Sequence, residues 1–170
     1  MKRVVFLSGP PKAGKSRLRG DIYRHLLTSG RKSWFVQAFS PDMEGQWVND
    51  SHALGNGERA EEIARRQKNK VKQAGEFFSP KFVAAMKQQL SGLLRTFGLV
   101  VADLGGFPSP ENREIISVAL GREDVVPFAV VLLNGGNDGG WGEFWNSLSV
   151  GCFTYEYSAD IASDIASKLM

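Results

Sequence analysis

Short, unbroken runs of apolar residues alternate along this chain with segments whose apolar residues recur about every fourth position. The unbroken runs predict buried strands over 2–7, 33–39, 99–102, 128–133 and 152–157. The periodic segments predict helices over 16–30, 79–94, 141–148 and 160–169, with a further helix beginning at Ser109-Pro110. Unbroken apolar strands are typical of a sheet covered on both faces, so the pattern indicates an α/β fold with a mainly parallel sheet.

Local signals mark several helix ends. Serine followed by proline, at Ser79-Pro80 and at Ser109-Pro110, predicts helix starts, because serine caps a helix and proline fits its first turn. Gly30 predicts the end of the first helix. The first helix is expected to bury Leu18, Ile22, Leu26 and Leu27, and the helix after Ser79 to bury Phe82, Val83, Met86, Leu90, Leu93 and Leu94.

The first predicted strand leads into a phosphate-loop pattern, G-x-x-x-x-G-K-[ST], written here Gly9-Pro10-Pro11-Lys12-Ala13-Gly14-Lys15-Ser16. In such a loop, successive backbone N–H groups and the helix N-terminus bind the phosphates. Lys15 is expected to reach the β- and γ-phosphates, and the Ser16 hydroxyl to bind Mg²⁺. The alternative is a glycine-rich turn before an ordinary helix. The position between a strand and a helix favours nucleotide binding by all eight residues.

Asp103 directly follows the strand over 99–102, where an acidic residue would complete the Mg²⁺ site with Ser16. The alternative is that Asp103 caps a turn. Gly105 and Gly106 follow at once, and a backbone amide there would contact a γ-phosphate, or the two glycines simply make the turn.

A second pair of carboxylates, Asp42 and Glu44, follows the strand over 33–39. The carboxyl edge of an open α/β sheet is where ligands bind. One of these groups is therefore expected to orient an acceptor hydroxyl or a water, or to assist Mg²⁺. The alternatives are that Asp42 caps a turn and that Glu44 is merely exposed. Trp47 would stack on a base or pack in the fold.

The type of nucleotide follows from a missing motif. A GTPase would show Asn-Lys-x-Asp after a late strand, and this chain has Asn134-Gly135-Gly136-Asn137-Asp138 there. The lysine is absent, so ATP is the expected nucleotide. Asn134 would line the base pocket or satisfy turn amides.

Charge is distributed unevenly. Residues 1–96 hold 18 Lys/Arg and 8 Asp/Glu, whereas residues 97–170 hold 3 and 10, so the net charges are +10 and −7. The basic run Arg65–Lys72 is a lid, a nucleic-acid patch or a solvated face of the polar segment 58–72, which is expected to be a surface helix. Candidates for an arginine on the γ-phosphate are Arg59, Arg65, Arg66, Arg113 and Arg122. His25 and His52 are isolated and support no metal site.

The remaining composition narrows the class of protein. Cys152 is the single cysteine, which excludes an internal disulfide and favours a reducing, cytoplasmic compartment. The apolar run near the start, Val4–Leu7, is too short for a signal peptide, and no run is long enough to cross a bilayer. The length predicts a single domain over 1–170.

Three elements together resemble one known group. They are Gly-Pro-Pro-x-x-Gly-Lys-Ser at 9–16, Pro-Asp-x-Glu-Gly-x-Trp at 41–47, and Asp-x-Gly-Gly at 103–106 ahead of Glu111-Asn112. The chain resembles, over residues 1–157, the P-loop domain labelled AAA that is fused to small CRISPR-associated ring nucleases, which degrade cyclic oligoadenylate. All 170 residues are accounted for by the P-loop domain, so the nuclease activity does not carry over. The resemblance implies a nucleotide-binding, kinase-like domain acting beside a separately encoded partner.

The sequence thus predicts a P-loop NTPase three-layer sandwich of the nucleotide-kinase type, with a five-stranded, mainly parallel sheet. The expected function is ATP- and Mg²⁺-dependent hydrolysis or phosphoryl transfer, with Lys15, Asp42, Glu44 and Asp103 as catalytic residues. The alternative is a nucleotide-dependent switch that contacts RNA, an oligonucleotide or a protein partner. A degenerate P-loop protein that keeps the fold for assembly alone is disfavoured by the intact Lys15 and Asp103. The oligomeric state stays open, a homo-oligomer included.

Overall fold

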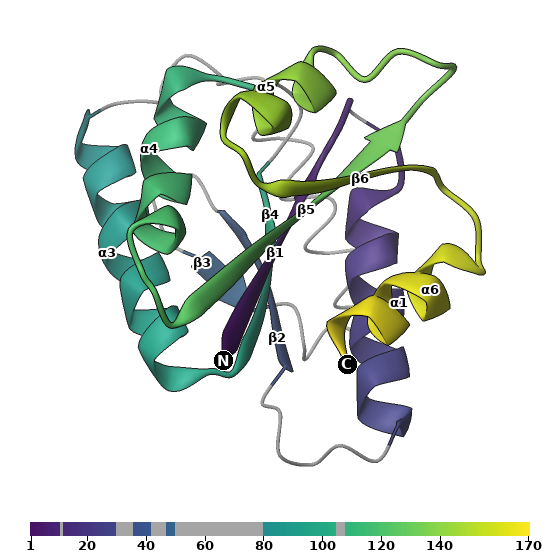
Figure 1. The fold of residues 1–170 in the computed structure, drawn as a ribbon, viewed down its shortest axis with the longest axis horizontal. Coiled ribbons are helices and arrows are strands. Elements are labelled where there is room, and N and C mark those ends of the chain that lie inside the picture. Colours follow the sequence, from purple (N-terminus) through teal and green to yellow (C-terminus); the bar gives the residue numbers. More distant parts are fainter. Residues whose placement is uncertain (11, 30–35, 42–46, 50–79, 105–107) are drawn as a thin grey trace.

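A computed structural model of the chain describes residues 1–10, 12–29, 36–41, 47–49, 80–104 and 108–170 (Figure 1). Several predictions therefore lie outside the described residues. They concern Pro11, Gly30, Asp42, Glu44, Ser79, Gly105, Gly106 and the polar segment 58–72.

The described elements alternate between strands and helices. The strands are β1 (Lys2–Ser8), β2 (Val36–Pro41), β3 (Trp47–Asn49), β4 (Leu99–Asp103), β5 (Val125–Leu133) and β6 (Gly151–Glu156). The helices are α1 (Lys15–Thr28), α3 (Pro80–Thr96), α4 (Pro110–Leu120), α5 (Trp141–Ser147) and α6 (Ile161–Leu169). This alternation confirms the predicted α/β class.

The strands form one sheet in the order β3-β2-β4-β1-β5-β6. Every neighbouring pair is parallel except β2 and β3, which are antiparallel. The prediction of five strands is wrong, because the sheet has a sixth, β3, that lies at an edge. A strand of three residues is too short to give a periodic signal, and its pairing with β2 depends on the intervening loop. The strand of Asp103, β4, pairs in parallel with β1, the strand that leads into the phosphate loop.

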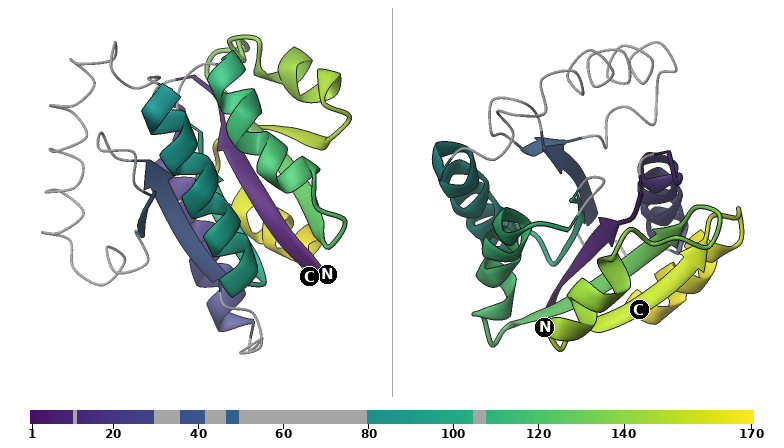
Figure 2. Two further views of the ribbon diagram at one scale, coloured as in Figure 1. Left: turned by 90° about the vertical axis from the view of Figure 1, so that its left-hand side faces the viewer. Right: turned by 90° about the horizontal axis from the view of Figure 1, so that it is seen from above.

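Helices cover both faces of the sheet (Figures 1 and 2). On one face, side chains of α3, α4 and α5 pack with Val4 and Phe6 of β1. On the other face, side chains of α1 and α6 pack with Val5 and Leu7. Successive residues of a strand point to opposite faces, so β1 contributes to both cores and lies between them.

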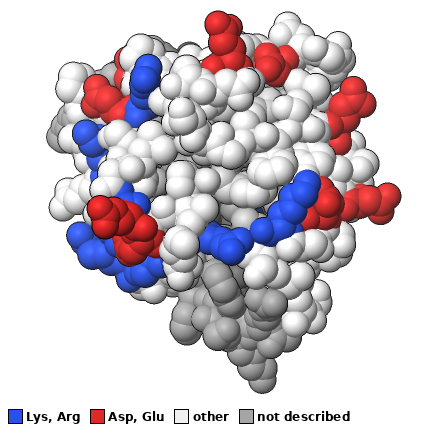
Figure 3. Space-filling model, viewed as in Figure 1, with Lys and Arg blue, Asp and Glu red and all other residues white. Residues whose placement is uncertain are grey.

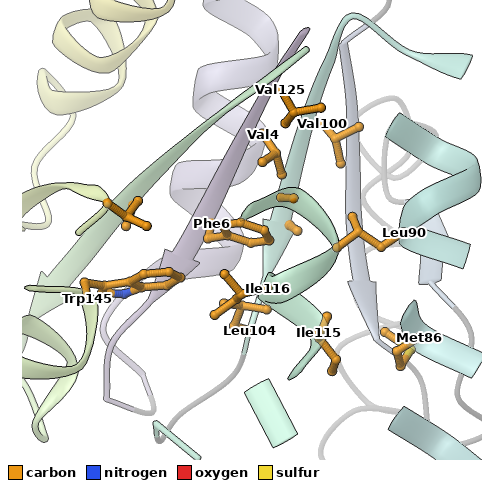
Figure 4. Close-up of a cluster of buried hydrophobic side chains, with 14 of the residues drawn as sticks. Val4, Phe6, Met86, Leu90, Val100, Leu104, Ile115, Ile116, Val125 and Trp145 are labelled. Atoms are coloured by element: carbon orange, nitrogen blue, oxygen red, sulfur yellow. The ribbon is translucent and has the colours of Figure 1, made fainter. Parts of the chain in front are cut away.

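The first core sets two aromatic side chains, Phe6 and Trp145, among aliphatic ones (Figure 4). The ring of Phe6 stacks on Trp145 with centroids 5.7 Å apart. The indole N–H of Trp145 donates a hydrogen bond of 2.7 Å to the hydroxyl oxygen of Ser8, which is also buried. A buried indole needs such an acceptor, and the bond ties α5 to the end of β1.

The second core is built from the predicted face of α1. Leu18, Ile22 and Leu26 are buried against the sheet and against Ile165 of α6. This confirms the expected periodicity for these three positions, whereas the side chain of Leu27 lies outside the described residues. The helix ends at Thr28, slightly before the predicted end at Gly30.

The α3 helix likewise buries Val83, Met86, Leu90 and Leu94. Leu93 is only partly buried against the same cluster, and the side chain of Phe82 lies outside the described residues. In the described part of the chain, no helix combines the length and apolar character that crossing a bilayer requires.

Candidate phosphate-binding site

The loop that carries the phosphate-binding motif leaves the carboxyl end of β1 and ends at the N-terminus of α1. Gly9 opens it with a φ angle of +140°, a conformation that L side chains rarely adopt. A Cβ on Gly9 would lie 2.4 Å from the carbonyl oxygen of Leu132, a backbone atom that cannot move aside. Glycine is therefore required here because the loop lies directly against the neighbouring strand β5.

The first turn of α1 points its N–H groups into this loop. Gly14 is the N-cap residue, with a left-handed φ of +97°, and it offers no side chain to these donors. The first turn also holds no acidic residue. An uncapped helix N-terminus carries partial positive charge and free donors, so the local structure favours an anionic ligand.

Lys15, the first residue of α1, turns its side chain back under the loop. Its Nζ donates hydrogen bonds of 2.9 Å and 2.8 Å to the carbonyl oxygens of Gly9 and Pro10. The residue is only 8% exposed. Burial lowers the pKa of the ammonium group, and the nearby carboxylate of Asp103 partly offsets this shift.

Asp103 ends β4 and lies beside Leu7 of β1 in the sheet register. Its carboxylate is buried, and the guanidinium of Arg19 lies 3.9 Å away. Arg19 is itself buried on α1, one turn after Lys15. The three side chains form a buried cluster with two positive charges and one negative charge, a balance that suits a phosphate ligand.

The donor set also fits a magnesium ion that arrives with phosphates. In the described ranges, no group of three or more His, Cys, Asp and Glu side chains is able to hold a metal ion. Ser16 is exposed in the first turn of α1, and Asp103 lies at the end of the adjacent strand. One hydroxyl, one carboxylate, phosphate oxygens and water are ligands that Mg²⁺ accepts.

Sequence reasoning missed two residues at this site. Arg19 follows Lys15 by four positions in a predicted helix, so the helical period could have placed it on the same face. Tyr157 lies against Gly14, where a Cβ on the glycine would come 2.8 Å from the tyrosine ring. No sequence signal joins these two positions, since one precedes α1 and the other follows β6.

Of the other described candidates, one lies at the loop edge of the sheet and one lies away from the loop. Asn134 follows β5 at the same edge of the sheet as the loop and is exposed, and Arg113 is exposed in the first turn of α4. Arg122 is a wrong candidate, because it lies between α4 and the amino end of β5, away from the loop. Its guanidinium instead donates to Asp124 at 2.9 Å and 2.8 Å.

Several candidates lie outside the described residues. They are Asp42, Glu44, Gly105, Gly106, Arg59, Arg65, Arg66, His52 and the side chain of Trp47. On the face drawn in Figure 3, described basic side chains lie mainly at the left and centre, and acidic ones lie along the upper and right margins and also among the basic ones at the left. The basic run 65–72, a candidate nucleic-acid patch, also lies outside the described residues.

Comparison with known proteins supports the fold and adds no function. No family model matches the chain, and no curated protein does so. Among solved structures, the chain is similar to APE1195, with 13% identity, a TM-score of 0.56, and coverage of 99% of this chain and 94% of that one. It also matches chloroplast FtsY from Physcomitrella patens, with 12% identity, a TM-score of 0.44, and coverage of 100% of this chain and 56% of that one.

At 13% identity the likeness to APE1195 concerns the fold alone. The parallel sheet, with a glycine loop between β1 and α1, is compatible with a P-loop fold. The resemblance to the CRISPR-linked group rests on sequence elements only, and the comparisons contain no such link.

Proposed function

We propose that this chain binds ATP with Mg²⁺ and either hydrolyses it or transfers its terminal phosphoryl group as a small, kinase-like enzyme. The observation that carries the proposal is the phosphate loop itself. It joins the central parallel strand β1 to the uncapped N-terminus of α1 and encloses the ammonium group of Lys15. This is the arrangement that phosphate binding by backbone N–H groups needs.

Binding would use residues 9–16 together. The backbone N–H groups of the loop and the first turn of α1 would donate to phosphate oxygens. Lys15 would exchange the carbonyl oxygens of Gly9 and Pro10 for β- and γ-phosphate oxygens, which carry full charges. Because Lys15 is already buried, its desolvation occurs on folding rather than on binding.

The chemistry would lie at the γ-phosphate. Ser16 and Asp103 would hold Mg²⁺, which when bound neutralises charge on the transferring phosphoryl group. Arg19 would keep the Asp103 carboxylate oriented through their ion pair. Asp42 or Glu44, which follow β2 in the chain, would orient the acceptor hydroxyl or the attacking water.

The proposal extends to the nucleotide and to a partner protein. The absent Asn-Lys-x-Asp motif favours ATP over GTP. The sequence resemblance to the CRISPR-linked group suggests a separately encoded partner.

The first test is ATP binding and phosphate release by the purified protein with Mg²⁺. Lys15→Ala should reduce turnover by about 100-fold or more, because it removes a charge aimed at the phosphates. Lys87→Ala is the matched control, since this lysine lies on α3 and pairs with Glu114 at 4.0 Å. Unchanged turnover in Lys15→Ala would overturn the proposal.

Acceptors are tested in the same assay with a panel of nucleotides, nucleosides and short oligonucleotides. Turnover that rises sharply with one compound would identify a kinase and its acceptor class. Tight ATP binding without turnover under any condition would favour the nucleotide-dependent switch.

A further inference from the structure

Tyr157 lies at the junction between the last strand and the phosphate loop. It follows β6 directly, and β6 is separated from β1 by β5. A Cβ added to Gly14 would lie 2.8 Å and 2.9 Å from Cγ and Cδ2 of the Tyr157 ring. Real Cβ atoms do not approach other heavy atoms this closely. The glycine that caps α1 is therefore covered by an aromatic ring from the other end of the chain.

The ring is fixed from its far end by the same helix. The Tyr157 hydroxyl donates a hydrogen bond of 3.0 Å to Oδ2 of Asp21, and Arg24 forms an ion pair with the same carboxylate, with Nη2 2.7 Å from Oδ1. The guanidinium carbon of Arg17 lies 5.7 Å from the centre of the ring. Burial and the bond to Asp21 raise the pKa of the phenol, so the hydroxyl stays protonated as a donor at neutral pH. Tyr157 thus touches α1 at its N-cap and again in its second turn.

The contact between Tyr157 and Gly14 bears on how the loop keeps its shape when no ligand is bound. The first N–H groups of α1 have no partner within the helix, and unsatisfied donors of this kind relax toward other partners unless packing prevents it. Gly14 has no side chain to restrict its φ angle of +97°, so its backbone has a wide range of accessible conformations. A rigid ring against Gly14 removes that freedom and lowers the entropy cost of binding.

We propose that Tyr157 is a positioning residue for the phosphate loop: its ring, packed on Gly14, holds the loop in its phosphate-binding shape before a ligand arrives. The expected effect on affinity rests on the proposed nucleotide binding, because a preformed loop raises the affinity for the phosphates of the nucleotide. The contact of the ring does the positioning, and the bond between the hydroxyl and Asp21 orients the ring.

The test compares three variants in two measurements. Tyr157→Ala removes ring and hydroxyl, Tyr157→Phe keeps the ring, and Tyr155→Ala is the matched control. Tyr155 lies two residues earlier and makes the same type of bond, of 2.6 Å to Asp164 on α6, but contacts that helix rather than the loop. The measurements are amide hydrogen exchange of residues 9–18 in the nucleotide-free protein, and the affinity for ATP with Mg²⁺.

Tyr157→Ala is expected to speed exchange in the loop and to weaken ATP binding by about tenfold or more. Tyr157→Phe should restore both to within about threefold of wild type, and Tyr155→Ala should change neither. Should Tyr157→Ala fail to fold, Tyr157→Leu replaces it, since leucine fills the space without a flat ring. Circular dichroism checks that each variant is folded.

Two results would overturn the proposal: loop exchange in Tyr157→Ala that equals wild type, or an equal effect of Tyr155→Ala. The exchange measurement needs no nucleotide, so it decides the role of Tyr157 by itself. If the wild-type protein bound no ATP, the proposed function would be wrong. The exchange measurement would still test whether the ring of Tyr157 holds the loop in place.

Discussion

At the scale of single residues, Lys15 connects the site to the stability of the molecule. Burial lowers its pKa below the ordinary value of 10.5, so the unfolded chain binds this proton more tightly than the folded one. Between the lowered value and 10.5, the unfolded state holds more protons, and stability therefore rises with pH. A buried ammonium group of this kind therefore lowers the stability of the folded state below pH 10.5.

We accordingly expect the unfolding free energy of wild type, relative to Lys15→Met, to increase as pH is raised from neutral toward 10.5. Urea unfolding at a series of pH values measures it. Lys12→Met is the control, since Lys12 is an exposed lysine of the same loop. A difference between wild type and Lys15→Met that falls with pH would contradict this assignment.

The same site shows how far residues can be predicted from sequence. Lys15 and Asp103 could be expected near one another, because both follow parallel strands that end at one edge. The ion pair of Arg19 with Asp103 could be predicted only by noting that Arg19 lies one helical turn after Lys15, on the same face of the helix. The ring of Tyr157 on Gly14 depends on how the segment after β6 packs on α1, and side-chain contacts between distant elements leave no periodic signal.

At the scale of elements, regular structure was predictable where a local signal was strong. The strands β1, β4 and β5 contain unbroken apolar runs. The bounds of β1, β4 and β6 lie within about one residue of the predicted ones, whereas β5 begins at Val125, three residues before its predicted start. Ser109 confirms its predicted role as N-cap of α4, since its hydroxyl accepts a hydrogen bond of 3.1 Å from the backbone N–H of Asn112. The sequence did not predict β3, because this strand has only three residues and is defined by its pairing with β2 at the edge of the sheet.

The cap of α4 gives a prediction at this scale. Ser109→Ala should lower the unfolding free energy by about 1 kcal/mol, because the N–H of Asn112 loses its acceptor. Thermal or urea unfolding measures the change. Ser117→Ala serves as control, since its exposed hydroxyl bonds only to Glu114 of the same helix and alanine favours helix. Equal losses in the two variants would argue against capping by Ser109.

At the scale of the whole molecule, the central strand joins two cores. Val4 and Phe6 belong to the core under α3, α4 and α5, and Val5 and Leu7 to the core under α1 and α6. The phosphate loop begins where this strand ends, and the Trp145 indole binds Ser8 at that point. Both cores therefore support the loop, and damage to one should reach the other through β1.

This coupling predicts that the two faces unfold together. Leu18→Ala removes a fully buried side chain from the α1 core and should cost about 2 to 5 kcal/mol. The loss should appear equally in far-ultraviolet circular dichroism and in the indole N–H resonance of Trp145, which reports on the opposite core. Leu120→Ala, at a position 39% exposed, is the control and should cost less than about 1 kcal/mol. If the Trp145 resonance in Leu18→Ala survived at urea concentrations where the dichroism is lost, the two cores would be independent and β1 would not couple them.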